Sequence, residues 1–211
     1  YFNEHLLPGL LGQTFIYTGL IAAFCTIIIG WLHHIKQKNN LLQHTTQWMF
    51  TIQMIAIIGV VFVLYFLLLH RYYEYRIIWQ YSSNDLPLKY LLACLWAGQE
   101  GSIITWLFFQ TLIGIFLIRN NSPSGNILLI LISAFNIYLY SMLLGWTFGS
   151  FHLGTSPFEL LRESVQNKDA LIFTSPHYLS LLTDGNGLNP LLQNFWMLSH
   201  PPVIFIGYAL T

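Results

Sequence analysis

Charged residues are scarce in this chain, and their scarcity excludes most soluble folds. Only 8 % of the 211 residues are Asp, Glu, Lys or Arg, whereas a soluble domain carries about 25 %. The basic and acidic residues cancel to a formal charge of zero, so no basic surface that would bind nucleic acid is expected. Hydrophobic residues make up 55 % and aromatic residues 17 %. This composition is typical of a polytopic membrane protein.

Cysteine is equally scarce. Cys25 and Cys94 lie in separate apolar segments without C-x-x-C spacing, which excludes a disulfide framework and a cysteine zinc site. The haem-attachment sequence C-x-x-C-H is also absent, so the chain is not itself a c-type cytochrome. We therefore expect both cysteines to be small packing residues in helices.

Long apolar runs dominate what is present. They predict an all-α transmembrane bundle with four spans and the start of a fifth, because about 20 apolar residues cross a bilayer as a helix. The third run is too long for one straight span and is interrupted by Gly98 and Gly101, so we expect a break or kink between Trp96 and Ser102. Four crossings place the N-terminus and residue 200 on the same side. The runs cover residues 9–32, 48–69, 88–118, 127–148 and 203–211.

The segments between the runs predict short helices at a membrane surface. Residues 72–85 are rich in Tyr and Trp, which favour the headgroup level. Residues 158–165 fit a short helix between turn signals. Asn189-Pro190 is typical of an N-cap followed by proline in the first helical turn, and the apolar residues after it fit an interfacial helix.

Several short motifs, taken in order, resemble the N-terminal part of the CcmF family, the haem lyase subunits of the System I pathway of cytochrome c maturation. Their order and spacing agree with the family over residues 90–211, whereas residues 1–90 agree mainly in hydropathy. The motifs are Trp96-Ala-Gly-Gln-Glu-Gly-Ser102, Thr155-Ser-Pro-Phe158, Leu188-Asn-Pro-Leu-Leu-Gln193, His200-Pro-Pro202 and Gly207-Tyr208.

The resemblance implies a multi-pass protein of the bacterial inner membrane. Residues 1–211 would be the N-terminal part of one polytopic membrane domain, with segments 70–89 and 149–200 in the periplasm. The full-length protein would receive haem b from the chaperone CcmE. It would then act with CcmH, which presents apocytochrome c, to form the thioether bonds. The tryptophan-rich segment and the other haem ligands of the family would follow Thr211, so the haem site and the lyase activity would be incomplete in this segment.

His200 is the main candidate ligand. We expect Pro201 and Pro202 to occupy the first turn of a helix, which places His200 at or just before the N-cap. The positive end of a helix disfavours the charged imidazolium, and coordination of a metal requires the neutral ring. The family resemblance implies that His200 is an axial ligand of haem iron; otherwise it is an interfacial histidine that caps a helix.

Glu100 and Trp96 are the other candidate cofactor-binding residues. Glu100 is the one acidic residue inside an apolar run, and an intramembrane carboxylate suggests function. It is protonated, pairs with Gln99 or a later arginine, orients a haem propionate through water, or forms a polar contact between helices at the bend. Trp96 packs on haem or anchors the chain at the interface.

Two other functional classes remain open at this stage. A transporter or channel also combines broken spans with an internal carboxylate. An anchoring subunit of a respiratory complex also fits the apolar composition.

Overall fold

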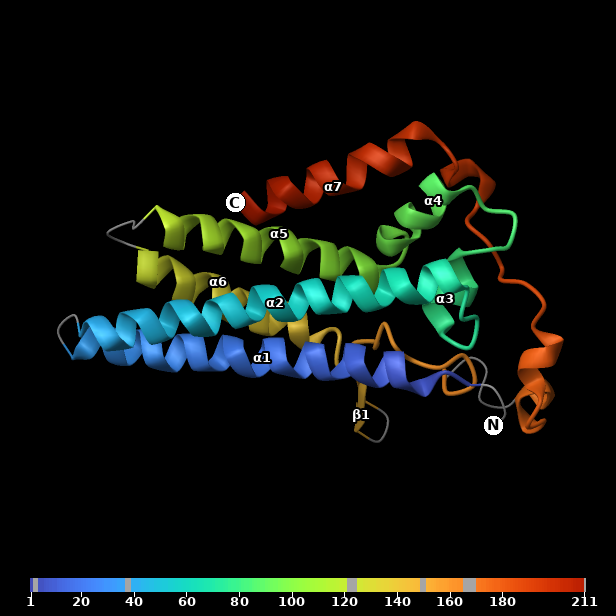
Figure 1. Cartoon of the computed structure of the whole chain (residues 1–211), viewed down its shortest axis with the longest axis horizontal. Coiled ribbons are helices and arrows are strands. Elements are labelled where there is room, and N and C mark those ends of the chain that lie inside the picture. Colours follow the sequence, from blue (N-terminus) through green and yellow to red (C-terminus); the bar gives the residue numbers. More distant parts are fainter. Residues whose placement is uncertain (2–3, 37–38, 121–124, 149–150, 165–169, 211) are drawn as a thin grey trace.

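The computed structural model describes residues 1, 4–36, 39–120, 125–148, 151–164 and 170–210. Four helices lie side by side in a bundle (Figure 1): α1 (Leu6–Ile35), α2 (Asn40–His70), α5 (Gln99–Arg119) and α6 (Gly125–Ser141). Helix α1 packs on α2 and α6, and α5 packs on α2 and α6. A further helix, α7 (Phe195–Leu210), packs on α5. The predicted helical membrane bundle is confirmed.

Three of the described helices, α1, α2 and α5, are long and apolar enough to cross a membrane. Helices α6 and α7 are shorter, with 17 and 16 residues, and about 17 residues is the lower limit of a span. The predicted fourth span at residues 127–148 is too long, because α6 ends at Ser141. The chain then turns through Gly145, whose φ of 63° is left-handed, into the antiparallel strands β1 (Trp146–Phe148) and β2 (Phe151–Leu153).

The predicted break in the third apolar run is confirmed. Helix α4 (Leu88–Ala93) continues into the 3₁₀ turn η1 (Cys94–Trp96), and α5 begins only at Gln99. The first turn of α5 lies directly against η1. A Cβ atom on Gly101 would lie 1.5 Å from the carbonyl oxygen of Leu95, so only glycine permits this approach.

We expect Gly101→Ala to lower the thermal unfolding midpoint of the purified protein. The added methyl group has to push α5 away from η1, and overpacking of this kind costs about 1–3 kcal/mol. The matched control is Gly207→Ala in α7, where an added Cβ meets nothing within 4 Å. That change should be neutral or stabilise the helix by up to about 1 kcal/mol. Equal midpoints for the two variants would contradict the close contact.

A layer of polar side chains joins three helices inside the bundle. Gln53 of α2 donates to Thr26 of α1 and to Ser133 of α6, both at 3.0 Å. It also accepts a hydrogen bond from Asn136 of α6 at 3.1 Å. All four residues are fully buried. In an apolar bundle such contacts fix which faces of the helices meet, so this layer sets the register of α1, α2 and α6.

The position of residues 72–85 at a membrane surface stays a prediction, but the segment is more buried than its aromatic composition suggests. This segment contains α3 (Arg76–Tyr81) and packs into the core at one end of the bundle, where Tyr75 is only 1 % exposed. The Tyr75 hydroxyl donates to the carbonyl of His5 at 2.6 Å and accepts from the amide of Gly9 at 3.0 Å. Burial is the main cause that raises the pKa of Tyr75 to about 12. The Tyr75 hydroxyl therefore finds its hydrogen-bond partners in the backbone at the start of α1 and not in lipid headgroups.

The predicted short helix at residues 158–165 is also wrong as far as residue 164; residue 165 lies outside the described residues. The backbone here pairs instead with the segment before α3. Arg76 donates its amide to the carbonyl of Glu159 at 3.0 Å, and Leu161 donates to Glu74 at 2.7 Å. Residues 159–163 are good helix formers by type, so the backbone pairing with the segment before α3 overrides their local propensity here.

The remaining short elements lie at the same end of the bundle as the N-terminus and the start of α7 (Figure 1). They are the 3₁₀ turns η2 (Leu171–Thr174), η3 (Tyr178–Leu181) and η4 (Pro190–Leu192). The predicted cap at Asn189 is confirmed, because its side chain accepts the amide of Leu191 at 3.0 Å.

Candidate functional site

His200 lies within α7 and not at its start, so the predicted helix boundary is wrong. Helix α7 begins at Phe195 and continues through Pro201 and Pro202. The positive end of the helix therefore lies more than one turn before His200. What the structure provides is an exposed imidazole on a continuous helix.

The face of α7 that carries His200 is apolar and open. Three exposed residues lie on the same face of the helix as His200. They are Trp196, four residues before it, and Val203 and Gly207, three and seven residues after it. An added Cβ at Gly207 would meet no atom within 4 Å. His200 thus stands on a smooth apolar stripe, with one aromatic ring a turn before it.

Trp96 joins η1 to the first turns of α7. Its indole nitrogen donates to the backbone carbonyl of Met197 at 2.8 Å. In a regular helix that carbonyl accepts from the amide four residues later, but residue 201 is proline and has no N–H. The indole of Trp96 therefore takes the position of the hydrogen bond that Pro201 cannot make.

Because the indole of Trp96 replaces the missing amide of Pro201 as a donor, the effects of mutating these two residues on stability should be coupled. Trp96→Phe should destabilise the protein by about 1 kcal/mol, because it leaves the Met197 carbonyl without a partner. In a Pro201→Ala background the new amide supplies that hydrogen bond, so the same Trp96→Phe change should cost clearly less. Thermal unfolding of the four proteins in this double-mutant cycle measures the difference. Equal costs in both backgrounds would refute the exchange of donors.

Glu100 is buried at 6 % exposure in the first turn of α5 and pairs with an arginine. Its partner is Arg76 of α3, which precedes it in the chain, whereas we expected Gln99 or a later arginine. Arg76 also binds Glu159 at 2.6 Å from the other side. The geometry thus agrees with the expected polar contact at the bend, and it extends that contact to three segments.

The ion-pair cluster of Arg76, Glu100 and Glu159 holds one positive and two negative charges. Burial lowers the pKa of the Arg76 guanidinium, but the two carboxylates raise it by more, so the net shift is upward. Arg76 therefore remains charged and fully committed to its partners. The cluster fixes the start of α5 against α3 and the loop after the hairpin.

Sequence reasoning missed Arg76 and Glu159, and it missed a second cluster nearby. Arg162 binds Glu4 at 2.8 Å, and Tyr178 donates to the same carboxylate at 2.7 Å. Glu4 is almost fully buried, with a side chain 3 % exposed. The scarcity of charged residues could have indicated these ion pairs, since a buried charge in an apolar chain needs a partner of opposite charge. The identity of each partner depends on the fold.

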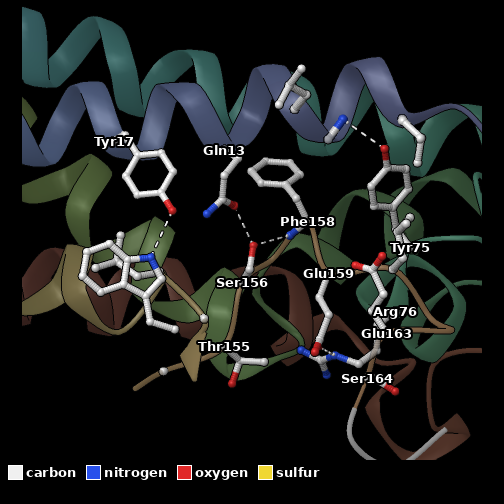
Figure 2. Close-up of a pocket in the computed structure, with 18 residues that line it drawn as sticks. Gln13, Tyr17, Tyr75, Arg76, Thr155, Ser156, Phe158, Glu159, Glu163 and Ser164 are labelled. Carbon is white, nitrogen blue, oxygen red and sulfur yellow. Dashed lines mark hydrogen bonds and ion pairs between the residues drawn. The ribbon is translucent and has the colours of Figure 1, made fainter. Parts of the chain in front are cut away.

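A cavity of about 890 Å³ lies between the N-terminal half of α1 and residues 144–164. Figure 2 shows two cross-links along it: Ser156 donates to Gln13 at 2.8 Å, and the indole of Trp146 donates to the hydroxyl of Tyr17 at 3.1 Å. Arg76, Glu159 and Glu163 are the charged residues among those of its lining that the structure describes.

This cavity does not fit a haem. Among the residues that the structure describes, its lining contains no histidine, cysteine or methionine to bind iron. Its carboxylates would also repel the propionates of the macrocycle. His200 is not part of the lining, so the candidate haem ligand and the cavity are separate features.

Among the described residues, no group of three or more His, Cys, Asp or Glu side chains is placed to hold a metal ion. A structural zinc site, which needs four such ligands, is therefore not formed by the part of the chain that the structure describes. A haem iron requires only one or two axial ligands from the protein. The exposed imidazole of His200 on an apolar stripe fits that smaller requirement.

Comparison with known proteins gives a consistent group of relatives. No protein-family model matches the chain. The cytochrome c-type biogenesis protein NrfE of Haemophilus influenzae is 28 % identical over 130 residues, which are 61 % of this chain and 17 % of the relative. The cytochrome c-type biogenesis protein CycK of Rhizobium meliloti is 27 % identical over 136 residues, 63 % of this chain and 16 % of that protein.

A solved structure described as the cytochrome c haem lyase CcmF has the same fold. It superposes with a TM-score of 0.69 over 99 % of this chain and 29 % of its own length, at 18 % sequence identity. This chain thus spans only 16–17 % of the length of the first curated relatives. In sequence and in fold, it resembles the CcmF, NrfE and CycK group of cytochrome c-type biogenesis proteins.

Proposed function

We propose that the protein handles haem b during cytochrome c maturation. In this role the full-length protein receives haem from a periplasmic chaperone of the CcmE type. It then promotes covalent attachment of the haem to apocytochrome c, which a CcmH-type partner presents. The proposal places the end of the bundle that carries the N-terminus and the start of α7 on the periplasmic side of the bacterial inner membrane.

One observation carries the proposal: the exposed imidazole of His200 on the apolar stripe of α7. A neutral imidazole is a common axial ligand of haem iron. The adjacent apolar surface suits a flat macrocycle, and Trp196, one turn before His200, offers an aromatic ring beside it. When bound, haem supplies the vinyl groups that form the thioether bonds; His200 holds and orients the iron.

Trp96 and Glu100 support this site in different ways in the proposal. Trp96 positions the start of α7 through the hydrogen bond that its indole donates to the carbonyl of Met197. We propose contact between its ring and the haem as a second role. Glu100 fixes the first turn of α5, on which α7 packs, through its pair with Arg76. Because its carboxylate is already paired, any effect on a haem propionate is indirect.

The test is haem binding by the purified full-length protein in detergent. We expect a Soret absorbance band whose position changes, or whose intensity falls severalfold, in His200→Ala. The control is His44→Ala, an exposed histidine near the start of α2, which should leave the spectrum unchanged. An unchanged spectrum in His200→Ala would overturn the ligand assignment. Absence of haem from the parent protein, even after incubation with a haem-loaded chaperone, would overturn the function and favour a transporter or an anchoring subunit.

A further inference from the structure

The cavity beside α1 opens on the side of a helix that is apolar enough to cross a membrane. Leu6 and Leu10 line the cavity and are also 51 % and 67 % exposed. Leu7 and Leu11 continue the exposed apolar surface on the same helix. One wall of the cavity is therefore continuous with the exposed apolar surface of a helix that is long and apolar enough to cross a membrane. A ligand with an apolar chain can reach the cavity from the bilayer.

The charged residues of the lining determine whether a cationic or an anionic ligand is favoured. Arg76 is the one basic residue among the described residues of the lining, and its guanidinium is held by Glu100 and Glu159. Glu159 and Glu163 both face the cavity. Within the described part of the chain, Glu163 pairs with Arg162 alone, at 3.2 Å, and its side chain is 55 % exposed. An exposed pair of this kind is weak. The lining thus carries excess negative charge and disfavours an anion.

The opposite part of the cavity is amphipathic and neutral. The hydroxyl of Thr155 and the Ser156–Gln13 pair provide polar groups. Tyr17 and Trp146 are joined through their polar ends (Figure 2). Rings with one apolar and one polar end are typical of the headgroup level of a membrane. These groups fit a molecule that is polar and cationic at one end and apolar at the other.

We propose that the cavity binds a phospholipid with a primary ammonium headgroup, such as phosphatidylethanolamine. The ammonium group has three donors and binds the carboxylates of Glu159 and Glu163. The Thr155 hydroxyl faces the phosphate, and an acyl chain follows Leu6 and Leu10. A quaternary choline headgroup carries the same charge but donates no hydrogen bond, so the cavity discriminates against it. This inference is independent of the haem-handling proposal.

Native mass spectrometry of the full-length protein in detergent tests the proposal. The protein is titrated with phosphatidylethanolamine, phosphatidylcholine or phosphatidylglycerol that have the same acyl chains. We expect about tenfold tighter binding of phosphatidylethanolamine than of phosphatidylcholine, because charge-assisted hydrogen bonds are lost with choline. Phosphatidylglycerol should bind most weakly. Free ethanolamine at the same concentration should not compete, since it lacks the chain that fills the apolar wall.

Two variants locate the binding. Glu163→Gln should weaken the binding of phosphatidylethanolamine by about threefold, a modest factor because the carboxylate is partly exposed. The matched control is Asp85→Asn, an exposed carboxylate outside the cavity, and it should leave binding unchanged. Equal binding of the three lipids, a preference for phosphatidylglycerol, competition by free ethanolamine, or equal affinities of the two variants would each overturn the proposal.

Discussion

Arg76→Leu should destabilise the protein by about 3–5 kcal/mol, among the largest effects of any single substitution in this chain. The change removes the one cation between Glu100 and Glu159 and leaves the buried Glu100 carboxylate without a partner. Breaking a buried pair from one side carries this cost because the remaining charge has lost its solvation and its counter-ion. Thermal unfolding in detergent and the yield of folded protein measure the loss.

The double variant Arg76→Leu/Glu100→Leu distinguishes the loss of the ion pair from the loss of packing by the arginine side chain. Replacing both buried partners by apolar residues is often nearly neutral, so the double variant should recover much of the stability. Glu159 has a side chain 22 % exposed and can turn to water. Lys89→Leu, an exposed residue close in sequence, should change stability by less than about 0.5 kcal/mol. A double variant as unstable as Arg76→Leu would show that the arginine acts through packing and not through its charge.

The helices of the bundle were predictable because their apolar runs are long. The runs at residues 9–32 and 48–69 lie within α1 and α2, although α2 begins earlier, at Asn40. The residues before Trp48 are mostly polar, so the hydropathy pattern does not reveal that they are helical. The signal for the true start is Asn39, whose side chain caps the helix by accepting from the amide of Leu41 at 2.9 Å. The break before α5 was predictable for another reason: two glycines and a carboxylate interrupt an apolar run that is too long for one span.

The candidate site was predictable by residue type and less so by geometry. Pro201 and Pro202 suggested a helix start, because proline is favoured in a first turn. The helix in fact begins six residues before Pro201, and the indole of Trp96, about a hundred positions away in sequence, satisfies the carbonyl that Pro201 leaves free. In the same way, Glu100 was recognisable as unusual, but Arg76 and Glu159 become its neighbours only through the folding of α3 and the loop after the hairpin. Periodicity and local motifs do not encode contacts at such separations.

His200→Ala should abolish cytochrome c maturation while the protein still inserts and folds. The imidazole is exposed on α7, so its removal creates no core cavity and should change stability by less than about 0.5 kcal/mol. What is lost under the proposed function is one axial ligand of the haem iron. Maturation is measured by covalent haem staining of a c-type cytochrome in cells that depend on this protein. His44→Ala, at the other end of the bundle, should mature cytochrome normally.

Chemical rescue distinguishes a ligand from a structural histidine. His200→Met and His200→Cys should retain part of the haem, because thioether and thiolate sulfur also bind haem iron. Imidazole added to the His200→Ala variant should restore part of the activity by filling the vacated position. A structural histidine would instead be replaced best by a residue of similar shape, and free imidazole would have no effect. Normal maturation in a stably expressed His200→Ala variant would exclude the ligand role, because the variant has no side chain at this position that can bind iron.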